Sequence, residues 1–183
     1  MNFRPNPLLY GAHEGFFSSF KLVVTMRHDV DHALLFNAVN STMKRYPYFS
    51  VFPQKNGEGI QLQFNETPVP VFKDGRCVAL GTKESDGHLL VFGCEGRRII
   101  LHASHYIADG MGISPLLLSV LYLYISTKYG TDGLNSKRIL MPNDPISDAE
   151  YVYPFPDLPF LTDDAEARKK NTEAVLFTRQ LRV

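Results

Sequence analysis

Cysteine and long apolar runs are scarce in this sequence of 183 residues, and each shortage excludes a class of protein. The two cysteines, Cys77 and Cys94, provide no disulfide framework and lack the paired spacing of a zinc site. The longest apolar stretch, residues 113–125, is interrupted by proline and serine and falls short of the roughly 20 residues that a membrane span needs. The first fifteen residues lack the apolar core of a secretory signal. These features predict a cytoplasmic protein without a membrane span.

A surplus of charge is also missing, since 19 basic and 19 acidic side chains give a formal net charge of +0. Proteins that bind nucleic acids usually carry a basic surplus, so no nucleic-acid partner is predicted. Hydrophobic residues make up 44% of the chain and charged residues 21%, as in ordinary soluble domains. The length fits one domain with a substantial core.

The apolar pattern predicts strands and helices in alternation. Residues 16–28 alternate between apolar and polar side chains, as in a strand with one buried face. A helix is expected to begin after Asp31, a good N-cap, and to end at Pro47. Two hairpins follow, with turns at Asn56-Gly57 and near Glu95-Gly96, and a short extended piece lies between them. The pattern thus predicts a chain that combines strands and helices.

A second helix is expected over residues 115–129, with Gly130 as its C-cap. It is apolar nearly all round, so we expect it to be buried on more than one side. Residues 131–161 hold five prolines, all within residues 141–160, and indicate an irregular connection. A short charged helix over 163–170 and a strand over 174–183 are expected after it. A strand at the end of the sequence suggests that it pairs with, or continues into, something else.

The segment HASHYIADGMG, residues 102–112, gathers the residue types that carry chemistry. His102, His105 and Asp109 have spacings of three and four, which would share one face of a helix and could bind a metal. However, residues 97–102 have the pattern of a strand, and the glutamate of the H-E-x-x-H metalloproteases is absent. We therefore expect no metal site. The other histidine and acidic cluster, RHDVDH at 27–32, is interpreted as the cap and first turn of a helix.

Two interpretations of this segment remain open on spacing alone. A histidine at the end of a strand, here His105, can act as a general base, because a neutral imidazole with a pKa near 7 accepts a proton from a hydroxyl, amine or thiol. Asp109 would then face away, and Gly110 would permit a tight turn into the helix. Alternatively, the segment is an ordinary turn whose aspartate caps the following helix.

The segment SHYIADG, residues 104–110, resembles the H-x-x-x-D-G motif of the chloramphenicol acetyltransferase-like superfamily. That group includes coenzyme A-dependent acyltransferases, alcohol acetyltransferases and the condensation domains of peptide synthetases. Residues 30–53 resemble the family's early helix, its charged-Tyr-Pro segment and the next strand. The resemblance covers about residues 8–130. It implies an α/β fold, namely one chloramphenicol acetyltransferase-like lobe with a mixed β-sheet and packed helices over 1–130. Residues 131–183 would then form an irregular connection, a short helix and a crossover strand toward a second lobe or partner.

The resemblance also assigns roles to three residues. His105 is expected to be the general base that takes a proton from an acceptor hydroxyl or amine as that atom attacks an acyl thioester. Asp109 is expected to support the site through a salt bridge to an arginine, and Gly110 to begin the helix. Acyl-CoA is the expected co-substrate and a small molecule the expected acyl acceptor, with no permanently bound cofactor and no metal.

The sequence departs from the family in two respects. Many members carry a second histidine before the base, where this sequence has Ser104, which favours an alcohol acyltransferase over a condensation domain. The chain also has length for only one lobe of the usual two, so a second lobe or a homo-oligomer is expected. The sequence thus predicts the N-terminal part of an acyltransferase. The alternatives are a condensation-type domain that uses thioesters on a carrier protein, and a non-catalytic lobe for binding or assembly.

Overall fold

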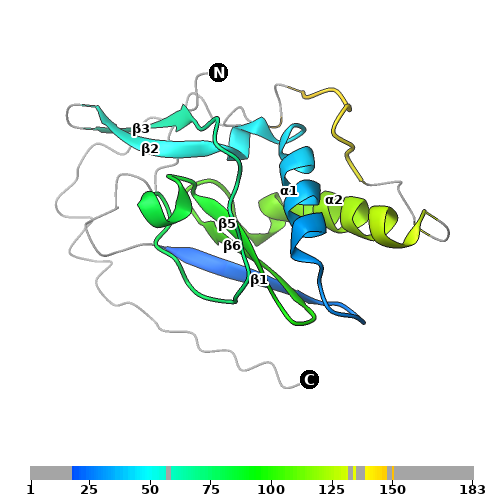
Figure 1. Ribbon diagram of the computed structural model, residues 1–183. Coiled ribbons are helices and arrows are strands. Elements are labelled where there is room, and N and C mark those ends of the chain that lie inside the picture. The colour runs from blue at the N-terminus through cyan, green and yellow to red at the C-terminus, as the bar shows by residue number, and fades with distance from the viewer. Residues whose placement is uncertain (1–17, 57–58, 132–133, 135–138, 148–149, 151–183) are drawn as a thin grey trace, which may run out of the picture. The chain divides into compact units, whose positions relative to one another are not determined.

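The computed structural model describes residues 18–56, 59–131, 134, 139–147 and 150 (Figure 1). Six strands, two α-helices and two short 3-10 helices form within these residues. In chain order they are β1 Ser19–Thr25, α1 His32–Met43, η2 Pro47–Phe49, β2 Val51–Asn56, β3 Gly59–Phe64, β4 Val71–Phe72, η3 Lys83–Ser85, β5 Leu90–Glu95, β6 Arg98–Ser104 and α2 Gly110–Tyr129.

The central layer is a four-stranded sheet in the order β1-β6-β5-β4. β6 runs antiparallel to both β1 and β5, whereas the short β4 runs parallel to β5. Helices α1 and α2 lie side by side (Figure 1) and pack into one hydrophobic core with the sheet. Leu101 and Phe92 from the sheet meet Leu35 and Leu116 from the helices in this core. The predicted α/β fold, with a mixed sheet and packed helices, is confirmed.

Both predicted hairpins are present. Strands β2 and β3 pair antiparallel as a separate two-stranded sheet. β5 and β6 form the second hairpin, where Glu95 pairs with Arg98 and Gly96 adopts a φ of 53°. A positive φ of this kind is unfavourable for residues with a side chain, which explains the glycine in this tight turn. The β5–β6 hairpin carries the segment of interest, because His105 follows β6 directly.

Helix α1 begins where the sequence predicts but ends earlier. The carboxylate of Asp31 accepts a hydrogen bond from the backbone N–H of Leu34, so Asp31 is the N-cap. The helix ends at Met43, four residues before Pro47, which instead starts the 3-10 helix η2. A proline suits the first position of a helix, where its missing N–H would have no partner anyway. The predicted end at Pro47 is therefore wrong.

The apolar pattern predicts that helix α2 begins at Pro115, whereas it begins five residues earlier, at Gly110, as the resemblance implies. Gly110 and Gly112 are poor helix formers and hid the first turn in the sequence. With 20 residues and a mean hydropathy of 1.4, α2 is long and apolar enough to cross a membrane by length and composition. The apolar stretch of residues 113–125, which the sequence predicts to be too short for a membrane span, is therefore only part of a longer apolar helix. A core helix passes the same test, and α2 contributes Leu116 and Val120 to the core with α1.

One face of α2 is exposed in the described part of the chain. Met111 is 83% exposed, Leu118 48% and Tyr129 54%. The helix was predicted to be buried on more than one side, but this face is not buried within the described residues. Residues 139–147 form neither helix nor strand. The helix predicted over 163–170 and the strand predicted over 174–183 lie outside the described residues.

Candidate active site

His105 lies in the turn that directly follows β6. Its backbone N–H donates to the carbonyl of Ser18, at 2.9 Å, so the turn is joined to the start of the edge strand β1. The half-buried imidazole packs against the ring of Phe20, with 4.5 Å between the ring centroids. The next residue, Tyr106, is buried against Val51 and Leu89. These contacts place His105 beside the edge strand β1 and next to the buried Tyr106, while part of its surface stays exposed.

Asp109 is the N-cap of α2. Its carboxylate accepts a hydrogen bond from the backbone N–H of Gly112, at 2.7 Å, and the side chain is exposed. Within the described residues it makes no ion pair with an arginine. The capping role that the sequence left open is therefore the one the geometry shows, and the salt bridge implied by the resemblance is not found there. An uncapped helix start would leave backbone donors without partners.

Gly110 is the first residue of α2, as the resemblance implies. Its φ lies outside the left-handed region, and a Cβ atom added to it would meet open space. Neither the backbone nor the surroundings within this lobe therefore require a glycine. The tight turn expected at Gly110 therefore does not explain why a glycine occupies this position.

His102 has surroundings that differ from those of His105. It is buried in β6, where it pairs with Lys21 on one side and Val91 on the other. Its Nε2 lies 3.1 Å from the hydroxyl of Ser19. Burial lowers the pKa of His102, and the nearby charge of Lys21 lowers it further. In the part of the chain that the structure describes, no three His, Cys, Asp or Glu side chains come close enough to hold a metal ion.

A cavity of about 400 Å³ lies on the other side of the loop that follows His105. Three aromatic side chains from the region of η2 form one wall, and the loop and the start of α2 form another. The lining residues are Tyr46, Tyr48, Phe49, Ile107, Ala108, Asp109, Gly112, Pro115, Leu140 and Glu150. No local sequence pattern predicts this cavity, because its walls come from segments far apart in the chain.

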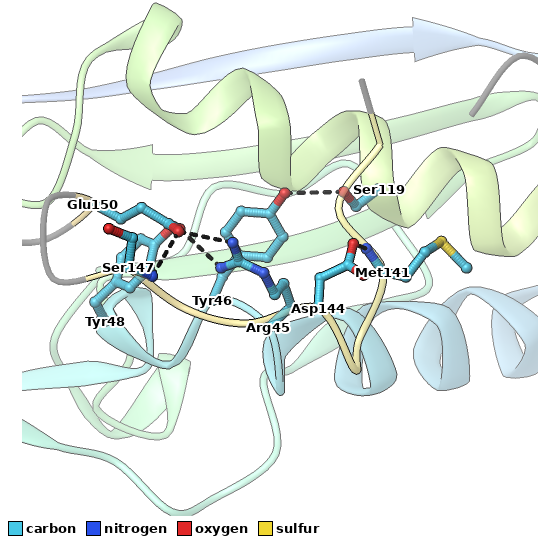
Figure 2. A network of polar contacts seen from close by, with 8 residues as sticks. All are labelled: Arg45, Tyr46, Tyr48, Ser119, Met141, Asp144, Ser147 and Glu150. Atoms are coloured by element: carbon cyan, nitrogen blue, oxygen red, sulfur yellow. Dashed lines mark hydrogen bonds and ion pairs between the residues drawn. The ribbon is translucent and has the colours of Figure 1, made fainter. Parts of the chain in front are cut away.

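Glu150, which lines this cavity, forms an ion pair with the buried Arg45 (Figure 2). The guanidinium of Arg45, only 2% exposed, donates two hydrogen bonds of 2.8 Å to the carboxylate of Glu150. The hydroxyl of Tyr48 donates to the same carboxylate at 3.0 Å. The hydrogen bonds from Arg45 lower the pKa of Glu150 to about 2. Arg45 and Glu150 are 105 residues apart, so no local pattern could have linked them.

The turn that carries His105 could support proton transfer. A partly exposed imidazole at a strand end can accept a proton from a bound hydroxyl or amine that reaches it. The backbone around it is fixed by the bond to Ser18 and by the cap at Asp109, so the ring is held in a defined place.

Comparisons at the level of sequence find no relative. No protein-family model matches the chain, and no curated protein matches it.

The fold, by contrast, is shared with solved structures. Polyketide synthase associated protein 5 from Mycobacterium tuberculosis aligns over 80% of the chain with a TM-score of 0.55 and 16% identity. The X-domain from teicoplanin biosynthesis aligns over 78% with a TM-score of 0.53 and 11% identity. The starter condensation domain of rhizomide synthetase RzmA aligns over 65%, at a TM-score of 0.48 and 12% identity. The first two likenesses show the fold of the chain, a mixed α/β lobe.

The alignments cover only part of the neighbours. The chain spans 36% of the polyketide synthase associated protein and 34% of the X-domain. It therefore corresponds to about a third of a larger architecture in each case.

Proposed function

We propose that this lobe serves an acyltransferase that moves an acyl group from a thioester to an alcohol or amine, with His105 as the general base. The observation that carries the proposal is the position of His105. It is half-buried, directly after a buried strand, and four residues before the capping Asp109 that starts α2. The fold shared with a polyketide synthase associated protein supports it.

The proposed reaction has two steps. In the first, a ring nitrogen of His105 takes the proton of the acceptor O–H or N–H, while the acceptor atom bonds to the thioester carbonyl carbon. In the second, the carbon–sulfur bond breaks and the leaving thiolate takes the proton from the imidazolium. The products are an ester or amide and a free thiol. Asp109 acts through position only, because its carboxylate is engaged with the backbone of α2.

The proposed donor is acyl-CoA, and a carrier protein that holds a thioester is the alternative. Both supply the same acyl–sulfur bond, so the chemistry at His105 does not separate them. Acyl-CoA and acyl-loaded carrier protein should be offered in parallel, each with a panel of alcohols and amines. Transfer is followed by thiol release and by mass spectrometry of the acylated acceptor.

The decisive variant is His105→Ala in the longest protein that contains this chain. We expect kcat to fall by roughly 10²–10⁴, the usual contribution of a general base. His32→Gln is the matched control, because His32 lies in α1, with its Nε2 2.7 Å from the carbonyl of Val71. It should leave kcat unchanged. A His105→Ala variant that retains full acyl transfer would refute the assignment.

A non-catalytic binding lobe is the second candidate. It is favoured by Asp109, whose carboxylate caps α2 and, within the described residues, lacks the arginine partner implied by the resemblance. A protein that binds acyl thioesters without transferring them, and whose His105→Ala variant binds them equally well, would support this candidate.

A further inference from the structure

A second cavity, of about 730 Å³, lies at the end of β1 that is remote from His105. The strand register separates the two places, since Ser19 at the start of β1 pairs with Ser104, while Thr25 at its end pairs with Arg98. The walls are residues 25–28 after β1, the last turns of α2, and Leu134. The volume lies in the range of small-molecule sites. The cavity is lined by residues of the RHDVDH segment and by tyrosines of α2. The catalytic proposal leaves both of these features unexplained.

Tyr124 lines this cavity, and its hydroxyl accepts two hydrogen bonds. Its oxygen accepts from the backbone N–H of Asp31 at 2.9 Å and from the ammonium of Lys128 at 3.1 Å. Tyr124 is only 1% exposed and lines the cavity. With both lone pairs of the oxygen engaged, its own hydrogen must point elsewhere. No acceptor for it is present among the residues that the structure describes, and a buried donor without an acceptor is costly.

The wall of this cavity includes the guanidinium of Arg27 and the imidazole of His28. Asp29 and Asp31 do not line it. Asp31 is engaged as the cap of α1. Lys128, which donates to Tyr124 and to the carbonyl of Asp29, adds positive charge close to the wall. An anion at Tyr124 would therefore be favoured by its surroundings.

Aromatic and apolar surface adjoins these donors. The ring of Tyr129 is half-exposed and lies 6.4 Å from the ring of His28, centroid to centroid. Met26 and Ile125 also line the cavity. Such surface suits a planar ring beside an anionic group.

We propose that this cavity binds an organic anion with an aromatic body. An anionic oxygen accepts the hydrogen bond of Tyr124 and faces Arg27 and His28, and the aromatic ring packs on Tyr129. The anionic group is a phosphate or a carboxylate, since both present acceptor oxygens with negative charge. This site is independent of the acyl transfer proposed at His105.

The test is isothermal titration of the purified chain with four probes. Adenosine monophosphate and benzoate carry an aromatic body with a phosphate or a carboxylate, whereas inorganic phosphate and adenosine carry one part each. We expect at least one of the two combined probes to bind, at least tenfold more tightly than phosphate or adenosine. The better of the two identifies the anionic group. Binding of neither at millimolar concentration would overturn the proposal.

Variants locate the binding. Tyr124→Phe should weaken it about 10- to 100-fold, the usual worth of a hydrogen bond to a charged group. Arg27 and Tyr129 are both exposed, so Arg27→Gln and Tyr129→Ala should weaken binding of the probe without affecting folding. If circular dichroism shows that Tyr124→Phe is unfolded, these two variants test the location of the site instead. Arg76→Gln, an exposed arginine beside Phe72, is the matched control and should bind normally. Equal affinity in the Arg27 and Tyr129 variants would refute this location.

Discussion

Asp109 shows how a residue can have a role at a site without touching the reaction. The resemblance pairs it with an arginine, whereas the lobe uses it to satisfy a backbone donor at the start of α2. Its contribution is then to hold the turn between His105 and the helix. Replacing such a residue should lower the stability of the fold, and it should affect catalysis only by moving His105.

We expect Asp109→Ala to lower the free energy of unfolding by about 1 kcal/mol, the usual cost of losing an N-cap. Asp109→Asn is the matched variant, because asparagine caps about as well as aspartate. Thermal unfolding should show a lower Tm for the alanine variant and a nearly unchanged Tm for the asparagine variant. If both keep the native Tm but abolish acyl transfer, Asp109 has a direct chemical role instead.

Glu150 should make stability depend on pH in the acid range. Arg45 holds its pKa near 2 in the folded protein, below the ordinary value of 4.5. A lowered pKa means that the folded state favours the ionised form. Glu150 therefore contributes stability that is fully present above about pH 4.5 and is lost as the pH falls toward 2. Urea unfolding between pH 2 and 6 measures this effect.

The control for this effect is Glu150→Gln, which keeps the shape and removes the charge. Its stability should be lower at pH 6, because Arg45 is left buried without its ionic partner. The difference from the native protein should shrink as the pH falls. A constant difference from pH 6 to pH 2 would show that ionised Glu150 contributes nothing to stability.

At the scale of elements, helix α2 has one face in the core and another apolar face that is exposed, and its sequence does not distinguish the two. It packs into the core through Leu116 and Val120, and it leaves Met111 and Leu118 exposed on another face. A continuous exposed apolar surface usually marks an interface. The helix is therefore a core element on one side and unpartnered within the described lobe on the other.

We expect the purified 183-residue chain to self-associate through this face of α2. The double variant Met111→Gln with Leu118→Gln should shift sedimentation velocity profiles toward the monomer, since exposed apolar area is removed without loss of core packing. Val23→Thr is the control, because Val23 is 51% exposed on β1 and should not change association. A native chain that sediments as a monomer at all concentrations would contradict this expectation.

For the whole molecule, topology places the two candidate sites at opposite ends of one strand. β6 lies between β1 and β5, so the turn after β6 meets the start of β1, and the hairpin turn before β6 meets its end. His105 belongs to the first end and the cavity of about 730 Å³ to the second. A ligand at one place can thus be studied without blocking the other.

The sequence by itself determined the local elements of this lobe. Alternating apolar residues located β1, the Glu95-Gly96 turn located the hairpin, and Asp31 located the start of α1. Each signal depends on residues close in the chain, where propensity and capping act. The motif with His105 was found for the same reason. The resemblance located the start of α2 at Gly110, but the apolar pattern missed it. Two glycines weaken helix propensity there, and the Asp109 cap and core packing override this effect.

Only the tertiary structure decided which distant residues meet. The ion pair between Arg45 and Glu150, the contact of Phe20 with His105, and the donors around Tyr124 all join separate segments. It also decided that Asp109 caps a helix and that His102 is buried apart from His105. The physical reason is that these contacts depend on strand order and helix packing. Those properties arise from the burial of apolar surface by the whole chain, and no local stretch of sequence encodes them.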